Sequence, residues 1–251
     1  MSEKLHKVLA DAGLGSRRQI ERWISEGRVT VDDRKAKVGD RVLRGVAVKV
    51  DGRPVAIRCE TQAPRVLVYH KPSGEICTRQ DPQQRPTVFR HLPTLPTGRW
   101  ICVGRLDLNT SGLLLFTNRG ELADRLMHPR TGIEREYLVR ITPPLTGQQK
   151  SRLKRGVDLD GQPARVDRLD ELRQGSGRNR WYRMVLTEGR YREIRRLCKS
   201  VGVTVSRLVR VRYGTVQLPR DQRPGVWREL DKGAIDRLVA VTQRGSDQPP
   251  A

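Results

Sequence analysis

The sequence lacks several features that would assign it to familiar classes of protein. It has no apolar run of about 20 residues, the length that a membrane-spanning helix needs, and no basic amphipathic anchor. Its N-terminus lacks the apolar core of a secretory signal. Its four cysteines include no C-x-x-C pair, which argues against a zinc site or a disulfide framework. We therefore expect a cytoplasmic protein without membrane, metal or disulfides.

Acidic residues are scarce relative to basic ones. The 251 residues include 50 Lys+Arg against 28 Asp+Glu, a formal net charge of +22. Such a chain repels itself unless a polyanion is its usual partner, so nucleic acid is the expected ligand. Hydrophobic residues make up 36% of the chain, enough for the packed core of one large or two smaller domains.

The N-terminal residues have the pattern of two short helices. Apolar residues recur at helical spacing over 5–12, and glycines then interrupt the pattern. Ser16 and Gln19 form a capping box that predicts the start of a second helix. The first turn of this helix presents Arg17 and Arg18, at the end where the helix dipole attracts phosphate.

The rest of the chain predicts a second, larger domain. Short strands near 28–31 and 46–50 complete an N-terminal domain over 1–50, and a charged, proline-containing linker is expected over 51–64. A domain of mainly antiparallel strands with helices among them follows over 65–242, without regular βαβ alternation. The fold class predicted is therefore α+β with a mixed sheet, and the last residues, 243–251, have the composition of a disordered tail. Within the second domain we expect strands near 101–104, 113–117, 135–141, 157–159, 164–169, 181–187 and 204–217, and helices near 120–127, 146–155, 190–201 and 232–241.

The segment 104–117 carries the strongest functional signal. It reads Gly-Arg-Leu-Asp-Leu-Asn-Thr-Ser-Gly-Leu-Leu-Leu-Phe-Thr, and it sets Asp107 in a turn between two apolar strands, directly after Arg105. An isolated aspartate in a turn is usually only a turn former. A calcium loop is excluded, because Asn118 stands where such a loop needs a bidentate glutamate. A fixed carboxylate beside a cation suits chemistry at a sugar carbon.

This segment resembles the pseudouridine synthases of the small-ribosomal-subunit type, whose signature G-R-L-D-x-x-T-x-G-L-L-L-x-T it matches at every specified position. The likeness extends from Glu3 to about Leu230, and the N-terminal pattern is similar to an S4-type RNA-binding module. The resemblance implies an S4-like domain joined to a catalytic domain of the pseudouridine synthase type. It also implies isomerisation of one uridine without a cofactor.

Two further segments supply candidate catalytic residues. On the helix predicted over 190–201, Arg195 lies at the edge of the apolar face and needs a charge partner, for which Asp107 is the obvious choice. The resemblance assigns the same ion pair. Tyr137 lies on the inward face of the strand over 135–141, where packing alone explains most tyrosines. The resemblance implies that Tyr137 stacks on the target base and serves as general base, and that Arg105 helps to extrude the nucleotide.

The remaining basic residues are candidates for RNA contact. Those assigned by resemblance to the S4 module are Arg17, Arg18 and Arg28. Those expected to contact phosphates in the catalytic domain are Arg192, Arg196, Lys199, Arg207, Arg210 and Arg212.

The resemblance implies a substrate in large-subunit (23S) rRNA, as a stem-loop or a pre-ribosomal particle, and we expect a monomer. The target base would have to leave its stack to reach the carboxylate. Asp107 could then attack the ribose or act by a related elimination. Two alternatives stay open: a sibling specificity for small-subunit rRNA or tRNA, and an RNA-binding ribosome-assembly factor without catalysis.

Overall fold

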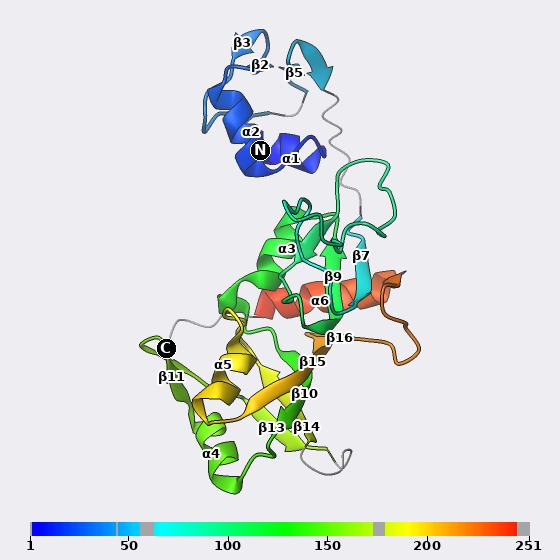
Figure 1. The fold of residues 1–251 in the computed structure, drawn as a ribbon. Coiled ribbons are helices and arrows are strands. Elements are labelled where there is room, and N and C mark those ends of the chain that lie inside the picture. The colour runs from blue at the N-terminus through cyan, green and yellow to red at the C-terminus, as the bar shows by residue number, and fades with distance from the viewer. Residues whose placement is uncertain (1, 44, 56–62, 173–178, 245–251) are drawn as a thin grey trace. The chain divides into compact units, whose positions relative to one another are not determined.

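The computed structural model of the protein describes residues 2–43, 45–55, 63–172 and 179–244 (Figure 1). The chain forms two compact units. The first comprises Met1–Pro64 with Pro93–Ile101 and Asn118–Gly120, and the second comprises the remainder. No helix in the described ranges is long and apolar enough to cross a membrane.

The first unit is built from two helices and short strands. Its elements are β1 (Glu3–Lys4), α1 (Leu5–Asp11), α2 (Arg17–Ser25), β2 (Val29–Val31), β3 (Arg34–Lys35), β4 (Arg41–Val42), β5 (Val48–Val50) and β6 (Arg53–Val55). The predicted capping box is confirmed, since the Ser16 side chain accepts from Gln19 N and the Gln19 side chain accepts from Ser16 N. Strand β6 pairs with β5, so the sheet includes residues that the sequence had suggested as linker.

The core of the first unit explains these elements. Leu5 and Leu9 on α1, and Ile20 and Ile24 on α2, are buried together with the valines of β2 and β5. The spacing of three or four residues places each apolar pair on one face of its helix. The predicted helices are confirmed, and the opposite face of α2 keeps its arginines in solvent.

The second unit contains a large mixed sheet. Its strands are β7 (Val66–Lys71), β8 (Ile101–Val103), β9 (Ser111–Thr117), β10 (Arg135–Thr142), β11 (Val157–Leu159), β12 (Gln162–Ala164), β13 (Arg168–Glu171), β14 (Arg180–Leu186), β15 (Thr204–Tyr213), β16 (Val216–Gln217) and β17 (Trp227–Glu229). Its helices are α3 (Gly120–Met127), η1 (Pro129–Thr131), α4 (Gly147–Arg155), α5 (Glu193–Ser200) and α6 (Lys232–Arg244).

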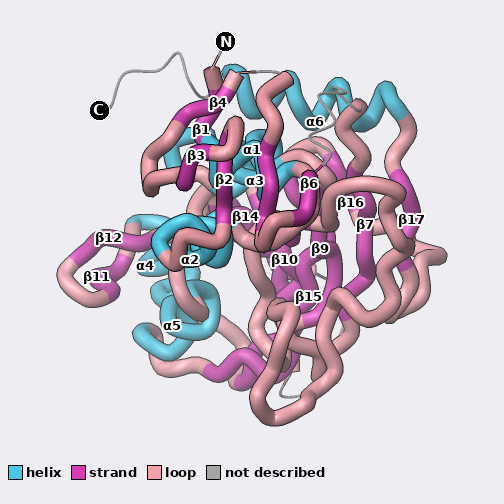
Figure 2. Tube along the Cα trace, turned by 90° about the horizontal axis from the view of Figure 1, so that it is seen from above, coloured by secondary structure: helices cyan, strands magenta, loops and turns pink. Residues whose placement is uncertain are grey.

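The sheet has the order β13-β14-β10-β15-β9-β7-β17 among the described strands, with β16 beside β15 and β8 beside β9. Strands β15 and β9 pair in parallel, and the other registered pairs are antiparallel. The predicted α+β class with a mixed, mainly antiparallel sheet is confirmed. Helix α6, red in Figure 1, lies on one face of β7 and β9, as the view in Figure 2 also shows.

Three predicted elements differ from those observed. The strand expected over 164–169 is divided into β12 and β13, and the strand expected over 204–217 turns at Gly214, which has φ of 56°. The helix expected over 190–201 begins only at Glu193, because Arg192 adopts a left-handed conformation with φ of 50°. The predicted tail begins inside α6, and residues 245–251 lie outside the described ranges.

Three central strands meet where the segment 104–117 enters the sheet. Gly112 on β9 lies opposite Arg210 on β15, and Arg210 lies opposite Tyr137 on β10. A side chain at Gly112 would approach the carbonyl oxygen of Arg210 to 2.2 Å, so glycine is required for β9 and β15 to pair. The register of β10 and β15 also shifts between Glu136 and Tyr137, as at a β-bulge.

Candidate functional site

A buried lysine holds the loop that carries Asp107 through hydrogen bonds. Lys71, at the end of β7, is fully buried, and its ammonium donates to the carbonyl oxygens of Pro72, Asp107, Leu108 and Thr110 at 2.9–3.4 Å. Burial lowers the pKa of Lys71. Backbone carbonyls rather than a carboxylate hold this cation, so its donors fix the shape of the loop around Asp107.

Arg195 fastens the same loop from α5. Its guanidinium donates to the carbonyl oxygen of Asn109 at 2.9 Å and to that of Val205 at 3.0 Å. The expected ion pair with Asp107 is not formed in the described structure, although the carboxylate lies close enough to raise the pKa of Arg195 against the larger lowering caused by burial. The sequence therefore predicted correctly that Arg195 lies near Asp107, but it predicted the wrong contact. The Arg195 side chain holds the loop through the backbone carbonyl oxygen of Asn109.

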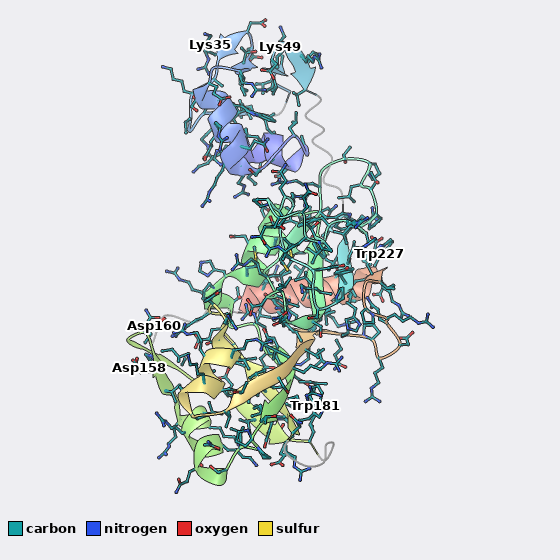
Figure 3. The ribbon with its side chains drawn as sticks, viewed as in Figure 1. Lys35, Lys49, Asp158, Asp160, Trp181 and Trp227 are labelled. Atoms are coloured by element: carbon teal, nitrogen blue, oxygen red, sulfur yellow. The ribbon has the colours of Figure 1, made fainter. Side chains whose placement is uncertain are left out.

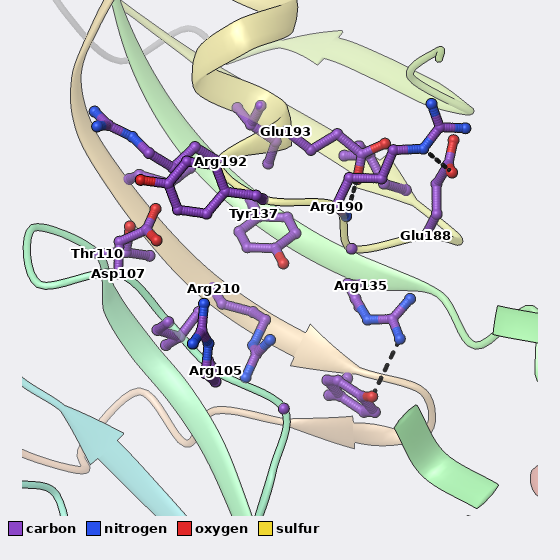
Figure 4. Close-up of a pocket in the computed structure, with 18 of the residues that line it drawn as sticks. Arg105, Asp107, Thr110, Arg135, Tyr137, Glu188, Arg190, Arg192, Glu193 and Arg210 are labelled. Carbon is purple, nitrogen blue, oxygen red and sulfur yellow. Dashed lines mark hydrogen bonds and ion pairs between the residues drawn. The ribbon is translucent and has the colours of Figure 1, made fainter. Parts of the chain in front are cut away.

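The Asp107 carboxylate lies at a cavity of about 680 Å³ (Figure 4). Among the described residues it has no hydrogen-bond or ion-pair partner. Tyr137 lines the same cavity and is 9% exposed, and Arg105 lines it with an exposed side chain. The structure thus places three of the four predicted catalytic and base-flipping residues, Arg105, Asp107 and Tyr137, at one cavity. The fourth, Arg195, contacts the backbone of the Asp107 loop instead.

The deeper wall of the cavity contains a tyrosine between two arginines. The guanidinium carbons of Arg135 and Arg210 lie 5.1 and 5.0 Å from the centre of the Tyr213 ring. Arg135 also donates to the carbonyl oxygens of Ile133 and Thr187 and to the Tyr213 hydroxyl. Arg210 donates from Nε to the carbonyl oxygen of Leu113. These contacts make the wall rigid and cationic.

The opposite wall contains a buried carboxyl group. Glu193, the first residue of α5, is 4% exposed and accepts from the Arg190 amide at 3.0 Å. Burial raises the pKa of Glu193 to about 7, and the neighbouring Glu188 also raises it. Arg190 pairs with Glu188 at 2.8 Å. Glu193 is therefore a group at the cavity that changes charge near neutral pH.

Two cysteines lie behind the Asp107 loop. Cys77 and Cys102 come from separate segments of the chain. The Cys77 sulfur accepts from the Leu106 amide at 3.4 Å, and the Cys102 thiol donates to the carbonyl oxygen of Gly104 at 3.0 Å. The neighbouring Cys102 is the largest cause that lowers the pKa of Cys77 to about 7, and Cys77 in turn raises that of Cys102. Cys59 lies outside the described residues.

The chain matches two family models. Residues 65–200 match the family described as RNA pseudouridylate synthase, and residues 3–48 match the S4 domain. The chain is 54% identical to ribosomal large subunit pseudouridine synthase B of Escherichia coli K12, with 97% of this chain and 84% of that one covered. This chain is a pseudouridine synthase. The Yersinia pestis protein of the same name is 52% identical, over 97% of this chain and 77% of its own.

A solved structure agrees with this assignment at the level of the fold. The structure titled "Crystal structure of pseudouridylate synthase" superposes with a TM-score of 0.64, covering 94% of this chain and 99% of that one. Because the two sequences are only 23% identical, this likeness concerns the fold alone.

The residues predicted to contact RNA differ in how the synthase presents them. Exposed side chains are those of Arg17, Arg18, Arg28, Arg192, Lys199 and Arg207. Arg28 is also paired with Asp51, at 2.6 Å, and stacks on Trp23. Arg196 reaches Asp160, at the tip of the β11–β12 hairpin (Figure 3), at 2.5 Å.

Two of those predictions are corrected by the structure. Arg210 is only 3% exposed, so it cannot contact a phosphate at the surface. Arg212 is half-buried and pairs with Glu134 and Glu136 at 2.8 and 3.0 Å. The alternation of β15 is the physical reason, because Arg210 and Arg212 share a face with the buried Leu208.

Sequence reasoning missed several residues of the site. It assigned no role to Lys71, Arg135, Thr110 or Glu193, nor to Tyr191, which lines the cavity and is 67% exposed. A lysine that ends the apolar run of β7 is a signal that could have identified Lys71.

Proposed function

We propose that this synthase converts one uridine of large-subunit rRNA to pseudouridine in the cytoplasm, with Asp107 as the nucleophile. The observation that supports the proposal most directly is the unpaired Asp107 carboxylate at a cavity shared with Tyr137, in a chain half identical to large-subunit synthases. A carboxylate without a protein partner is free to act on a ligand.

The reaction needs no oxidant, reductant or added water. The Asp107 carboxylate attacks C1′ of the target ribose, and the N1–C1′ bond breaks with its electron pair on the uracil. The base then turns, C5 attacks C1′, and the carboxylate is displaced. C5 then loses its proton and N1 gains one, which completes the C-glycoside, so atoms and charge are the same before and after. The route follows the logic of retaining glycosidases.

Other residues of the site have roles that fit this route. Tyr137 is suited to stack on the base and to accept the C5 proton, because it faces the cavity from the rigid strand β10. Arg105 is exposed beside Asp107, where a guanidinium can replace the extruded nucleotide in its stack. Lys71 and Arg195 act on the loop and not on the substrate.

Capture of the RNA is assigned to exposed basic residues. The S4 domain contributes Arg17 and Arg18, and the catalytic unit contributes Arg192 and Arg207. Phosphate contacts of this kind supply affinity without reading sequence, so the choice of uridine depends on RNA shape. A stem-loop suits extrusion, because its bases are the least costly to unstack.

The catalytic claim is tested by release of tritium from rRNA labelled at C5 of uridine. The parent protein should release tritium, and the Asp107→Asn variant should release none while it keeps rRNA affinity within a few-fold. Asp236→Asn, on the exposed side of α6, is the matched control and should behave as the parent. Turnover by Asp107→Asn at the parent rate would exclude this nucleophile.

The choice of substrate needs a separate measurement. Mapping of pseudouridines in a deletion strain should show one large-subunit site lost and restored by the gene. Loss confined to small-subunit rRNA or tRNA would indicate a sibling specificity. Loss of no site, with impaired assembly of the subunit, would indicate a binding factor without catalysis.

A further inference from the structure

Arg210 is a buried cation at the cavity whose hydrogen bonding is incomplete. It is 3% exposed, yet among the described residues its hydrogen bonds are limited to the one from Nε to the carbonyl oxygen of Leu113. Its Nη2 has no hydrogen-bond partner within the same described ranges. The nearby Arg135 donates to three acceptors, and Lys71 donates to four. Two of the buried cations, Arg135 and Lys71, therefore have several oxygen acceptors each, whereas the hydrogen bonding of Arg210 is incomplete.

No carboxylate compensates Arg210 in the described part of the chain. Arg212, two residues later, pairs with two glutamates, which shows that the strand can accommodate such partners. Stacking on Tyr213 offsets part of the cost of burial but satisfies no N–H group. The thiols of Cys77 and Cys102 lie within electrostatic range of Arg210, but in the described part of the chain neither sulfur accepts a hydrogen bond from its guanidinium. A buried guanidinium in this state is costly unless an anion arrives.

The reaction produces such an anion at the right stage. When the N1–C1′ bond breaks, the electron pair stays on uracil and its charge spreads over N1 and the two carbonyl oxygens. When C5 rejoins C1′ the base is neutral again, and the later loss of the C5 proton is balanced by protonation of N1. The charge therefore exists only between the two steps. A fixed cation that is uncompensated in the resting enzyme stabilises this anion more than the neutral uridine, which is the condition for acceleration.

The register of the sheet supports this assignment. Arg210 is the direct partner of Tyr137 across β10 and β15, and of Gly112 across β15 and β9. It thus lies between the strand that presents the tyrosine and the strand that follows the Asp107 loop, and all three groups line one cavity (Figure 4). A base that reaches Asp107 and contacts Tyr137 comes within reach of this guanidinium.

We propose that Arg210 is a catalytic residue that donates to a carbonyl oxygen of the extruded uracil and stabilises the uracil anion released when the N-glycosidic bond breaks. This inference rests on the proposed function of the cavity. It holds for attack at C1′ and for elimination alike, because both release the base with the bonding electron pair. In this proposal the uracil anion is the partner that Arg210 lacks among the described residues of the protein.

The test compares two leaving groups in single-turnover reactions. Full-length Arg210→Met, Arg210→Lys and parent enzymes are mixed in excess with large-subunit rRNA transcripts containing uridine or 4-thiouridine. Digestion, chromatography and mass spectrometry then give the rate of isomerisation. Sulfur disperses the charge of the departing base, so the thio-substrate depends less on the cation. Arg140→Met is the control, since Arg140 lies on β10 and bonds to Ser206 outside the cavity.

We expect Arg210→Met to lose about 100- to 1000-fold with uridine, as for removal of an oxyanion donor, and less than about tenfold with 4-thiouridine. Arg210→Lys should lose less than Arg210→Met on uridine, because it keeps the charge. Equal losses on both substrates, or a loss below about threefold on uridine, overturn the inference. If Arg210→Met does not fold, the rates of Arg210→Lys on the uridine and 4-thiouridine transcripts are compared in the same way. A parent enzyme inactive on both transcripts would refute the proposed function instead.

Discussion

The two units of the synthase use basic residues in different ways. In the S4 domain the arginines of α2 remain exposed on a helix whose other face is apolar core. In the catalytic unit Lys71 and Arg135 are buried and are held by backbone carbonyls. Exposed cations exchange partners with water at little cost, whereas buried ones require fixed acceptors. Binding therefore tolerates movement in the first unit, and chemistry requires a rigid frame in the second.

Among the variants that test this contrast between the two units, replacement of the buried lysine has the largest expected effect. Replacing Lys71 by Met removes the donor that joins four carbonyl oxygens, so the Asp107 loop loses its fixed shape. We expect kcat to fall about 100-fold, because displacement of a reacting group by about 1 Å has this effect, with KM almost unchanged. The measurement is steady-state tritium release over a range of rRNA concentrations.

Lys150→Met provides the matched control for this variant. Lys150 pairs with Glu171 at the surface of the same unit, where an ion pair contributes at most about 1 kcal/mol. It should retain the parent kcat. A Lys71→Met enzyme that kept kcat within about twofold would show that the loop does not need its lysine.

The S4 domain gives a smaller and different effect. Replacing Arg17 and Arg18 by Ala removes two exposed cations, so we expect KM to rise about tenfold at moderate salt with kcat within about twofold. The slope of log affinity against log salt should become shallower by about 1.5, near 0.7–0.9 for each lost phosphate contact. Binding titrations at several salt concentrations measure this slope.

A double variant in the same unit controls for the lost charge. Arg34 and Arg41 are exposed but have protein partners, Asp40 and the Ser2 residue respectively. Their replacement by Ala should change the salt slope much less. An equal change in both double variants would mean that total charge, and not the start of α2, governs capture of RNA.

The contrast between the units also explains what the sequence could predict. The capping box at Ser16 and the inward face of Tyr137 depend on neighbours within a few residues, so local patterns predicted them. Arg195 was predicted to form an ion pair with Asp107, but among the described residues it donates instead to the backbone carbonyls of Asn109 and Val205. Helical periodicity predicts which face of the helix a side chain occupies, but not which of several nearby atoms it contacts.

The buried cations could not be predicted in the same way. Arg210 becomes a cavity residue because β15 lies between β9 and β10, and this order joins segments about a hundred residues apart. Leu208, two residues earlier on β15, is buried on the same face of the strand, but Arg210 was predicted to contact a phosphate. The helix predicted over 190–201 begins only at Glu193 because Arg192 takes a left-handed conformation, so Tyr191 precedes the helix and is exposed.

The smallest expected effect concerns the pH dependence of stability. The pKa of Glu193 is raised from 4.5 to about 7 by burial, so folded protein retains a proton that unfolded chain loses between these values. The free energy of unfolding should therefore fall as pH rises from about 4.5 to about 7, and then level. Glu193→Gln should flatten this part of the curve in urea unfolding at pH 5, 6, 7 and 8. Glu171→Gln, which changes an exposed carboxylate, should retain the parent slope. Parallel curves for the parent and Glu193→Gln would show that the pKa of this carboxyl group is not raised in the folded protein.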